Sequence, residues 1–272
     1  TGEVAVKVQR PGLLRGVSRD LHVVLRAAAG AAPLAARLGA RTDLEALLES
    51  FAAGFLDELD FGAEAASQER FRGDMLERCA GEVYVPAVHR ALSSRTVLVT
   101  EWVEGVPASR ADPAMVRGAM PAVKRYALTS LLETGFFHTD PHAGNLVLLP
   151  DGDARGQLCV LDFGLMATFP EAVRDGICSW VVHMSNRDFE ALVEDHVALG
   201  FLPGSMSAGE RAASRRIMER VYTPYVFGGG GLRSLQGLPV LELLQDLAAA
   251  ANEVPFSIPP YIVQLGRAVL QL

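Results

Sequence analysis

Hydrophobic and polar residues alternate with a period of two near the start of the chain, over residues 3–9. This pattern predicts a β-strand whose two faces carry different side chains. Ala5 and Lys7 share one face. The other face is apolar and carries Val4, Val6 and Val8.

Longer segments with helical periodicity, broken by short strand-like runs, make up the rest of the chain. Helices are predicted at about 13–38, 43–78 and 113–135. The second is expected to begin at Thr42 or Asp43, and Pro121 is expected to kink or restart the third. From residue 170 onward the pattern is helical, with breaks at Pro203-Gly204, Pro224, residues 228–231 and Pro259-Pro260. Strands are predicted at 83–91 and 95–104, joined by a turn at Ser93-Ser94, and as a pair around 145–149 and 157–161. This order of strands and helices along the chain predicts an α+β protein. A small β-containing lobe is expected over residues 1–104 and a larger helical lobe over residues 105–272.

Composition narrows the class of protein. The chain has 272 residues, half of them apolar, and a net charge of −7, which argues against binding to nucleic acid. Cys79, Cys159 and Cys178 lack metal-ligand spacing and indicate buried thiols in a reduced, cytoplasmic setting. No apolar run is long enough for a membrane span, although the Ala- and Leu-rich helices allow a protein that lies against a membrane.

Two short polar motifs lie beside the predicted strand pair. In residues 138–145, Asp140 is followed five positions later by Asn145, and Asp162 follows the apolar run 158–161 on a turn with Gly164. Phosphoryl transfer from ATP needs one carboxylate to orient the attacking oxygen, and an amide and a carboxylate to hold Mg²⁺. Each motif alone is also compatible with an ordinary turn, but both would then have to be accidental.

The first motif also contains two histidines. His138 is expected to pack or hydrogen-bond so that it holds the loop. His142 is compatible with a substrate contact and equally with a residue that caps the loop.

Lys7 and an acidic run at residues 57–64 form a further candidate site. Lys7 can reach phosphate oxygens as a point charge, and Glu64 is its natural partner. Taken alone, Lys7 is equally compatible with a solvated strand lysine, and the acidic run with a solvated helix face.

Five segments of the chain form one set of motifs. They are Val4-Ala5-Val6-Lys7-Val8-Gln9-Arg10-Pro11-Gly12, Glu58-x-Asp60-Phe61-x-x-Glu64-Ala65, Phe137-His138-Thr139-Asp140-Pro141-His142-Ala143-Gly144-Asn145, Leu161-Asp162-Phe163-Gly164 and Pro259-Pro260-Tyr261. The set resembles the UbiB/ADCK (aarF-domain) family of atypical kinases over essentially the whole chain. The resemblance implies that the family's N-terminal extension, nucleotide loop and C-terminal end lie outside this chain.

The resemblance also implies roles for individual residues. Lys7 and Glu64 would form the ion pair between strand and helix, and Asp140 would be the catalytic aspartate. Asn145 and Asp162 would bind Mg²⁺. The pair Glu58 and Asp60 would be the family's regulatory acidic motif, which contacts the N-terminal extension.

We therefore predict a bilobed protein-kinase-like fold with an incomplete N-lobe, which binds Mg²⁺ and ATP between its lobes. Backbone groups of Glu101 and Val103 are expected to bind the adenine. The resemblance implies an atypical kinase or ATPase that supports the synthesis of ubiquinone or another isoprenoid-quinone lipid, with a lipid precursor and a membrane surface as partners. The alternatives are a small-molecule phosphotransferase of the aminoglycoside or choline kinase type, and a non-catalytic nucleotide-sensing scaffold. The oligomeric state is not predicted.

Overall fold

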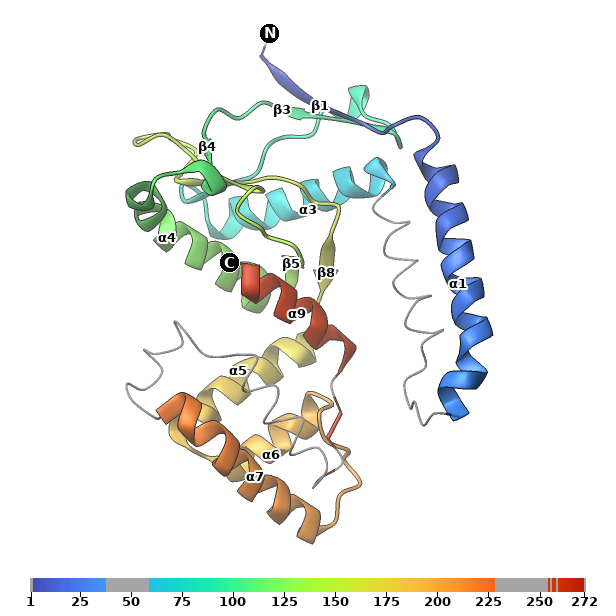
Figure 1. Cartoon of the computed structure of the whole chain (residues 1–272). Helices are drawn as coiled ribbons and strands as arrows, with labels where there is room; N and C mark the ends of the chain where they lie inside the picture. Colours follow the sequence, from blue (N-terminus) through green and yellow to red (C-terminus); the bar gives the residue numbers. More distant parts are fainter. Residues whose placement is uncertain (1, 38–58, 228–253, 255, 258, 272) are drawn as a thin grey trace. The chain divides into compact units, whose positions relative to one another are not determined.

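The chain folds as a mixed α+β protein, as predicted (Figure 1). The computed structural model describes residues 2–37, 59–227, 254, 256–257 and 259–271. It contains two compact units, which we describe separately: unit 1 (residues 1–129, 138–166 and 271–272) and unit 2 (residues 130–137 and 167–270). These units divide the chain differently from the predicted lobes, 1–104 and 105–272, which stay a prediction.

Unit 1 begins with a two-stranded antiparallel sheet. Strand β1 (Val4–Val8) confirms the predicted strand and pairs with β3 (Val97–Glu101), so that Lys7 lies opposite Leu98. Successive side chains of a strand point to opposite faces, and this places Lys7 and Ala5 together. The predicted helix after the strand is also found, as α1 (Leu13–Arg37).

A second sheet of unit 1 has the strand order β2-β7-β6-β4. Its strands are β2 (Val83–Tyr84), β4 (Val106–Pro107), β6 (Leu146–Leu148) and β7 (Leu158–Val160). Strands β6 and β7 are antiparallel, which confirms the predicted pair around 145–149 and 157–161.

The predicted strand pair of residues 83–91 and 95–104 is found only in part: β3 lies within the second segment, but only Val83–Tyr84 of the first segment forms a strand. Strand β2 instead runs parallel to β7, and the Glu82 carbonyl accepts the N–H groups of Gln157 and Leu158. Gly156 permits this pairing, because a Cβ at Gly156 would lie 2.6 Å from the Glu82 carbonyl oxygen. Closer to the predicted turn, Val88 forms a bridge with Thr100, and the N–H groups of His89 and Glu101 donate to the Val99 and Ala87 carbonyls. The 3₁₀ turn η1 (Arg90–Leu92) lies between the two segments.

Helices α3 (Phe61–Arg78) and α4 (Pro113–Leu128) contact the strands of unit 1, α3 drawn in cyan and α4 in green in Figure 1. The C-terminal part of the predicted helix 43–78 is found as α3, which begins after Asp60, whose carboxylate accepts the Gly62 N–H at 2.8 Å. Residues 43–58 lie outside the described part of the chain. The short turn η2 (Ala108–Arg110) precedes α4, which contains Pro121. A π-helical turn, η3 (Thr129–Thr134), replaces the last part of the predicted helix 113–135.

The segment between the predicted helix 113–135 and the Asp140 loop is a strand. Gly135 has a φ of 67°, a left-handed conformation that ends the helical run, and β5 (Phe136–His138) follows. Strand β5 pairs with β8 (Met166–Thr168), which the sequence pattern did not predict.

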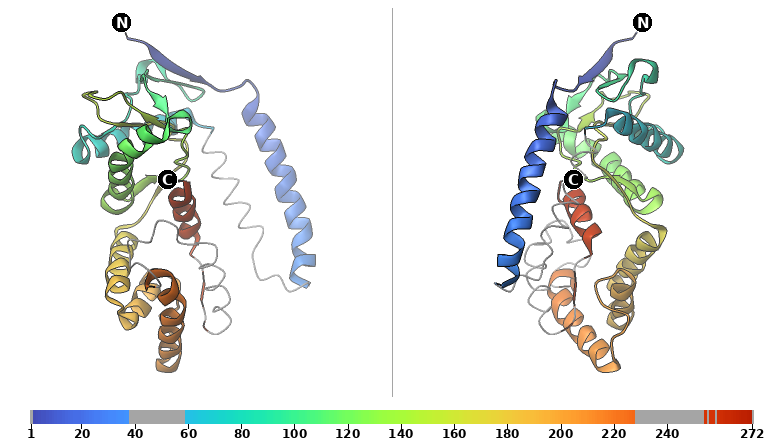
Figure 2. Two further views of the ribbon diagram at one scale, coloured as in Figure 1. Left: turned by 60° about the vertical axis from the view of Figure 1, so that its left-hand side comes forward. Right: turned by 90° about the vertical axis from the view of Figure 1, so that its right-hand side faces the viewer.

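Unit 2 is helical, as its periodicity predicts. Helices α5 (Glu171–Asn186), α6 (Phe189–Ala198) and α7 (Ala208–Phe227) lie side by side, as both views of Figure 2 show, and α9 (Pro260–Gln271) follows later in the chain. The break at Pro203-Gly204 is confirmed between α6 and α7, and Pro259-Pro260 marks the start of α9. The break at Pro224 is wrong, because this exposed residue lies inside α7. Residues 228–231 lie outside the described part of the chain.

Two further expectations can be compared with the structure. Cys79 and Cys159 are buried, as predicted for structural thiols, but Cys178 is exposed. Within the described residues, no helix has both the length and the apolar character needed to cross a bilayer.

Candidate active site

Unit 1 contains an open cavity of about 180 Å³ with a polar lining. It is lined by residues from β1, α3, the loop after β5 and the turn after β7: Lys7, Glu64, His138, Asp140, His142, Asn145, Asp162, Gly164 and Leu165. Five of the residues proposed from sequence therefore meet in one place, namely Lys7, Glu64, Asp140, Asn145 and Asp162.

Lys7 and Glu64 form the predicted ion pair. The Lys7 Nζ donates to both carboxylate oxygens of Glu64, at 2.8 and 2.9 Å, and lies 3.6 Å from Asp162 Oδ1. Glu64 is only 4% exposed, whereas the Lys7 side chain is 45% exposed. The Phe61 ring lies beneath the ammonium group, 5.1 Å from Nζ. The pair thus holds the ammonium group at the wall of the cavity and leaves part of it open to a ligand.

The start of α3 explains why Glu64 points to this place. Asp60 caps the helix through the Gly62 and Ala63 N–H groups, and Glu64 therefore falls in the first turn, where the helix dipole favours a negative charge. Asp60 does not line the cavity, so its observed role in the structure is to cap α3. Its predicted partner Glu58 lies outside the described residues.

The loop after β5 carries Asp140 and Asn145. His138 Nδ1 accepts the Asp140 N–H at 3.0 Å, which confirms that this buried histidine holds the loop. The Asn145 amide Nδ2 donates to the Asp140 carbonyl at 3.4 Å, and the Leu161 N–H donates to the Asn145 carbonyl at 2.8 Å. The Asn145 side-chain oxygen is therefore turned away from the Asp140 carbonyl, toward which its NH₂ group points.

Asp162 stands on a strained turn directly after β7. Its φ of 63° is in the left-handed region, which few residues other than glycine, asparagine and aspartate adopt. The Gly164 N–H donates to Asp162 Oδ1 at 3.2 Å and stabilises this conformation. Phe163 is buried, and its ring centroid lies 5.5 Å from that of Phe71 on α3.

The electrostatic setting differs between the carboxylates. Burial raises the pKa of Glu64 above its ordinary value, and the hydrogen bond from Lys7 offsets this only in part. Burial also raises the pKa of Asp162, but the charge of Lys7 and the Gly164 N–H outweigh it, so that this pKa lies below its ordinary value. Burial lowers the pKa of His138 and favours the neutral ring. Asp162 is therefore held as a carboxylate at the mouth of the cavity.

The donor set fits Mg²⁺ bound together with phosphate. Magnesium is usually held by one or two carboxylates together with water and substrate phosphates. Asp162 offers a half-exposed carboxylate and Asn145 an amide oxygen on the same cavity. Across the described residues, no three His, Cys, Asp or Glu side chains are grouped as a metal site, so a metal held by the protein alone does not fit.

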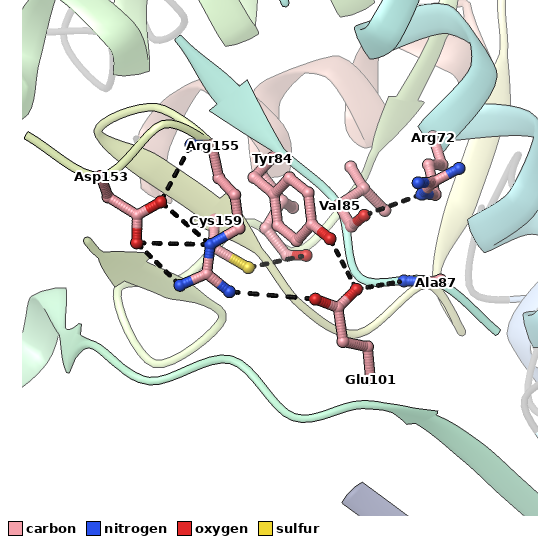
Figure 3. Close-up of polar contacts among 9 residues, drawn as sticks. Arg72, Tyr84, Val85, Ala87, Glu101, Asp153, Arg155 and Cys159 are labelled. Carbon is pink, nitrogen blue, oxygen red and sulfur yellow. Dashed lines mark hydrogen bonds and ion pairs between the residues drawn. The ribbon is translucent and has the colours of Figure 1, made fainter. Parts of the chain in front are cut away.

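Glu101, one of the two residues expected to bind adenine, has a fully engaged side chain (Figure 3). Its Oε2 accepts the Tyr84 hydroxyl at 2.5 Å and the Ala87 N–H at 3.2 Å. The Arg155 guanidinium lies 3.9 Å from Oε1, is paired with Asp153 at 2.7 Å, and covers the Tyr84 ring. Burial, followed by the bond to Glu101, raises the pKa of Tyr84 to about 12. The Glu101 side chain is therefore occupied by contacts within the protein.

The backbone N–H groups of Glu101 and Trp102 bind two different parts of the chain. The Trp102 N–H donates to the carbonyl of Glu3, the residue before β1, whereas the Glu101 N–H donates to the Ala87 carbonyl. Val103 lies two residues after the end of β3, outside the regular strand. The Val103 side chain packs on the cluster of Val147, Leu149 and Cys159. Neither Glu101 nor Val103 is among the described residues that line the Lys7 cavity.

Sequence reasoning missed Tyr84 and Arg155. Tyr84 reads as one aromatic residue in a short strand, and Arg155 as one basic residue in a polar turn. Nothing in either local pattern indicates that both contact Glu101, because the three residues come from separate elements.

Comparisons with known proteins identify the family. A family model described as the ABC1 atypical kinase-like domain matches residues 1–196. The chain belongs to the ABC1 atypical kinase-like family. Relatives of this family carry the names aarF domain-containing kinase and UbiB kinase, so the resemblance inferred from the motifs is confirmed.

Two relatives and one solved structure show the extent of the likeness. An uncharacterized protein of Synechocystis sp. is 34% identical over 100% of this chain, and an uncharacterized aarF domain-containing protein kinase of Arabidopsis thaliana, described as chloroplastic, is 35% identical over 99%. The chain spans only 38% and 36% of their respective lengths. Rv3197 of Mycobacterium tuberculosis, solved with erythromycin, has a similar fold, with a TM-score of 0.56 and 23% identity over 83% of this chain and 55% of that chain.

Proposed function

We propose that the protein is an atypical kinase or ATPase that uses Mg²⁺ and ATP, with phosphoryl transfer in the Lys7 cavity. The observation that carries the proposal is the meeting of five groups on one cavity: Lys7 paired with buried Glu64, the carboxylates of Asp140 and Asp162, and the amide of Asn145. Phosphoryl transfer depends on positioning and charge stabilisation, and this set provides both.

Each residue has a role in that reaction. Lys7 neutralises phosphate charge, and Glu64 keeps its ammonium group in place. Asp162 and Asn145 hold Mg²⁺, which supplies further charge neutralisation when bound. Asp140 orients the acceptor hydroxyl or water. The bond between the γ-phosphorus and its bridging oxygen breaks, a bond from the acceptor oxygen forms, the acceptor proton passes to Asp140, and ADP leaves.

The adenine is proposed to bind the Glu101 carbonyl and the Val103 N–H, in a bilobed kinase-like arrangement. The support is that the Glu101 side chain is held by Tyr84 and Ala87 and so cannot itself compete for these groups. A role in the synthesis of ubiquinone or another isoprenoid-quinone lipid, at a membrane surface, rests on the family resemblance alone.

Thermal unfolding with and without Mg²⁺ and ATP tests the proposal, with the parent protein beside the Asp162→Asn variant. A ligand at roughly 100 times its Kd stabilises the folded state by about 2.7 kcal/mol, which corresponds to several degrees. We expect this rise in Tm for the parent and its loss in the variant. An equal rise in both would show that the nucleotide binds elsewhere.

A second variant separates an enzyme from a scaffold. Asp140→Asn should bind Mg²⁺ and ATP but lose turnover of ATP, measured by release or transfer of labelled γ-phosphate. An unchanged rate would favour a nucleotide-sensing scaffold. Transfer of the label to an amino-alcohol or a sugar would instead favour a small-molecule phosphotransferase.

A further inference from the structure

His142 makes three hydrogen bonds within the loop between β5 and β6. Its backbone N–H donates to the Asp140 carbonyl at 2.8 Å, and its carbonyl accepts the Asn145 N–H at 2.8 Å. Its ring Nδ1 accepts the Gly144 N–H at 3.1 Å. A Cβ at Gly144 would lie 3.0 Å from both Nδ1 and Cε1 of the ring, so the ring lies directly against this glycine.

The bond to Gly144 fixes where the ring carries its proton. A backbone N–H can only donate, so Nδ1 must be the acceptor and the neutral ring must carry its hydrogen on Nε2. The side chain is exposed and lines the cavity. Among the described residues, no group pairs with Nε2. The two sequence-based roles for His142, a cap and a substrate contact, are therefore compatible, because each uses a different ring nitrogen.

The charges of the cavity indicate what this N–H could bind. Glu64, Asp140 and Asp162 bring three carboxylates to the lining. The one lysine of the lining already contacts two of them, Glu64 and Asp162. A terminal phosphate close to Asp140 would meet negative charge, so a donor on the same loop as Asp140 would offset it.

We propose that His142 donates a hydrogen bond from Nε2 to the terminal phosphate of the bound nucleoside triphosphate. This inference rests on the proposed function and adds a catalytic residue to it. The residue would distinguish a triphosphate from a diphosphate, because the contact exists only when the terminal phosphate is present. It would also hold the phosphate beside Asp140 while the acceptor attacks.

Two substitutions distinguish the role of Nδ1 from the role of Nε2. His142→Asn keeps an acceptor at the position of Nδ1, so the cap to Gly144 is retained as an Asx turn, but the donor at Nε2 is lost. His142→Gln places an amide NH₂ group at the reach of Nε2 and removes the cap. Calorimetric titration with Mg²⁺ and the β,γ-imido analogue of ATP, and with Mg²⁺ and ADP, then gives four affinities to compare with the parent protein.

We expect His142→Asn to lose about tenfold in affinity for the triphosphate analogue, the effect of one hydrogen bond to a charged group, with ADP affinity unchanged. His142→Gln should retain most of the triphosphate affinity. The reverse order, with the Asn variant like the parent and the Gln variant weakened for both nucleotides, would assign His142 to the cap alone and overturn the inference. A parent protein that binds ADP and the analogue would leave the proposed function standing in that case. Binding of neither nucleotide would overturn both.

Discussion

His196, on α6 in the interior of unit 2, is expected to make the stability of this unit depend on pH. Its Nδ1 lies 2.6 Å from the Leu192 carbonyl and its Nε2 lies 2.9 Å from the Tyr222 hydroxyl. Since a carbonyl can only accept, Nδ1 carries the hydrogen and Nε2 accepts from Tyr222. The ring is 1% exposed and borders a small apolar cavity lined in part by Leu202 and Met218. Burial outweighs the opposing effects of the Leu192 carbonyl and Asp195 and lowers the pKa of His196 from 6.5 to about 4.

The sign and size of the effect follow from this pKa. The folded state favours the neutral ring, so the stabilisation is complete above pH 6.5 and is lost as the pH falls from 6.5 toward about 4. One pKa unit corresponds to about 1.36 kcal/mol, which gives a total loss of about 3 kcal/mol. Between about pH 7 and about pH 5, the free energy of unfolding should fall by about 2 kcal/mol.

Urea denaturation followed by tryptophan fluorescence measures this loss. The chain has two tryptophans, and Trp180 lies in unit 2 with its ring centroid 5.8 Å from that of Tyr222. In a Trp102→Phe background the fluorescence therefore reports on unit 2. The non-titrating variant His196→Gln, in the same background, should show a pH dependence smaller by about 2 kcal/mol. An identical pH dependence in the two proteins would refute the assignment of the effect to His196.

Four further substitutions have expected outcomes in urea or thermal unfolding. Lys7→Met should destabilise the protein by about 2 kcal/mol at neutral pH, because it leaves the buried carboxylate of Glu64 without its cation, and the loss should shrink in acid as Glu64 is protonated. Glu64→Gln should cost less, since the half-exposed lysine can turn to water; equal losses would contradict this reasoning. Asp60→Ala should lower stability by about 1 kcal/mol through loss of the α3 cap, and no change would mean that the cap is not needed. Gly105→Ala should destabilise by about 2 kcal/mol, because the new Cβ would lie 2.7 Å from the Leu148 carbonyl oxygen, and a neutral result would show that this contact relaxes freely.

Local sequence patterns predicted the elements whose structure depends mainly on their own residues. The alternation of residues 3–9 defines β1, and the Asp–Asn spacing and the Asp162 turn identify groups that line one cavity. The pairing of Lys7 with Glu64, 57 residues further along the chain, was predicted from their opposite charges and from the family motifs. These features depend on side-chain periodicity and chemistry, which the sequence states directly.

Features that depend on distant parts of the chain were not predictable in the same way. The strand β2 reads as half of a hairpin, but its neighbour is β7, which lies far along the chain and is brought close by Gly156. The start of α3 at Phe61 depends on an Asp60 cap that competes with a continuous helical pattern. The turn η3 and strand β5 depend on backbone conformations, such as the left-handed Gly135, that apolar periodicity does not reveal.

The turn between β6 and β7 has a practical consequence for labelling and protein engineering. A polar, glycine-containing surface turn is normally a good place to insert a tag or a fluorophore. The two ends of this turn differ in their contacts. Asp151 and Gly152 are exposed. Arg155 pairs with Asp153 and contacts Glu101, which belongs to the segment proposed to bind adenine. An insertion at Asp151–Gly152 should leave these contacts intact, whereas one placed three residues later should disrupt the contacts of Arg155 with Asp153 and Glu101.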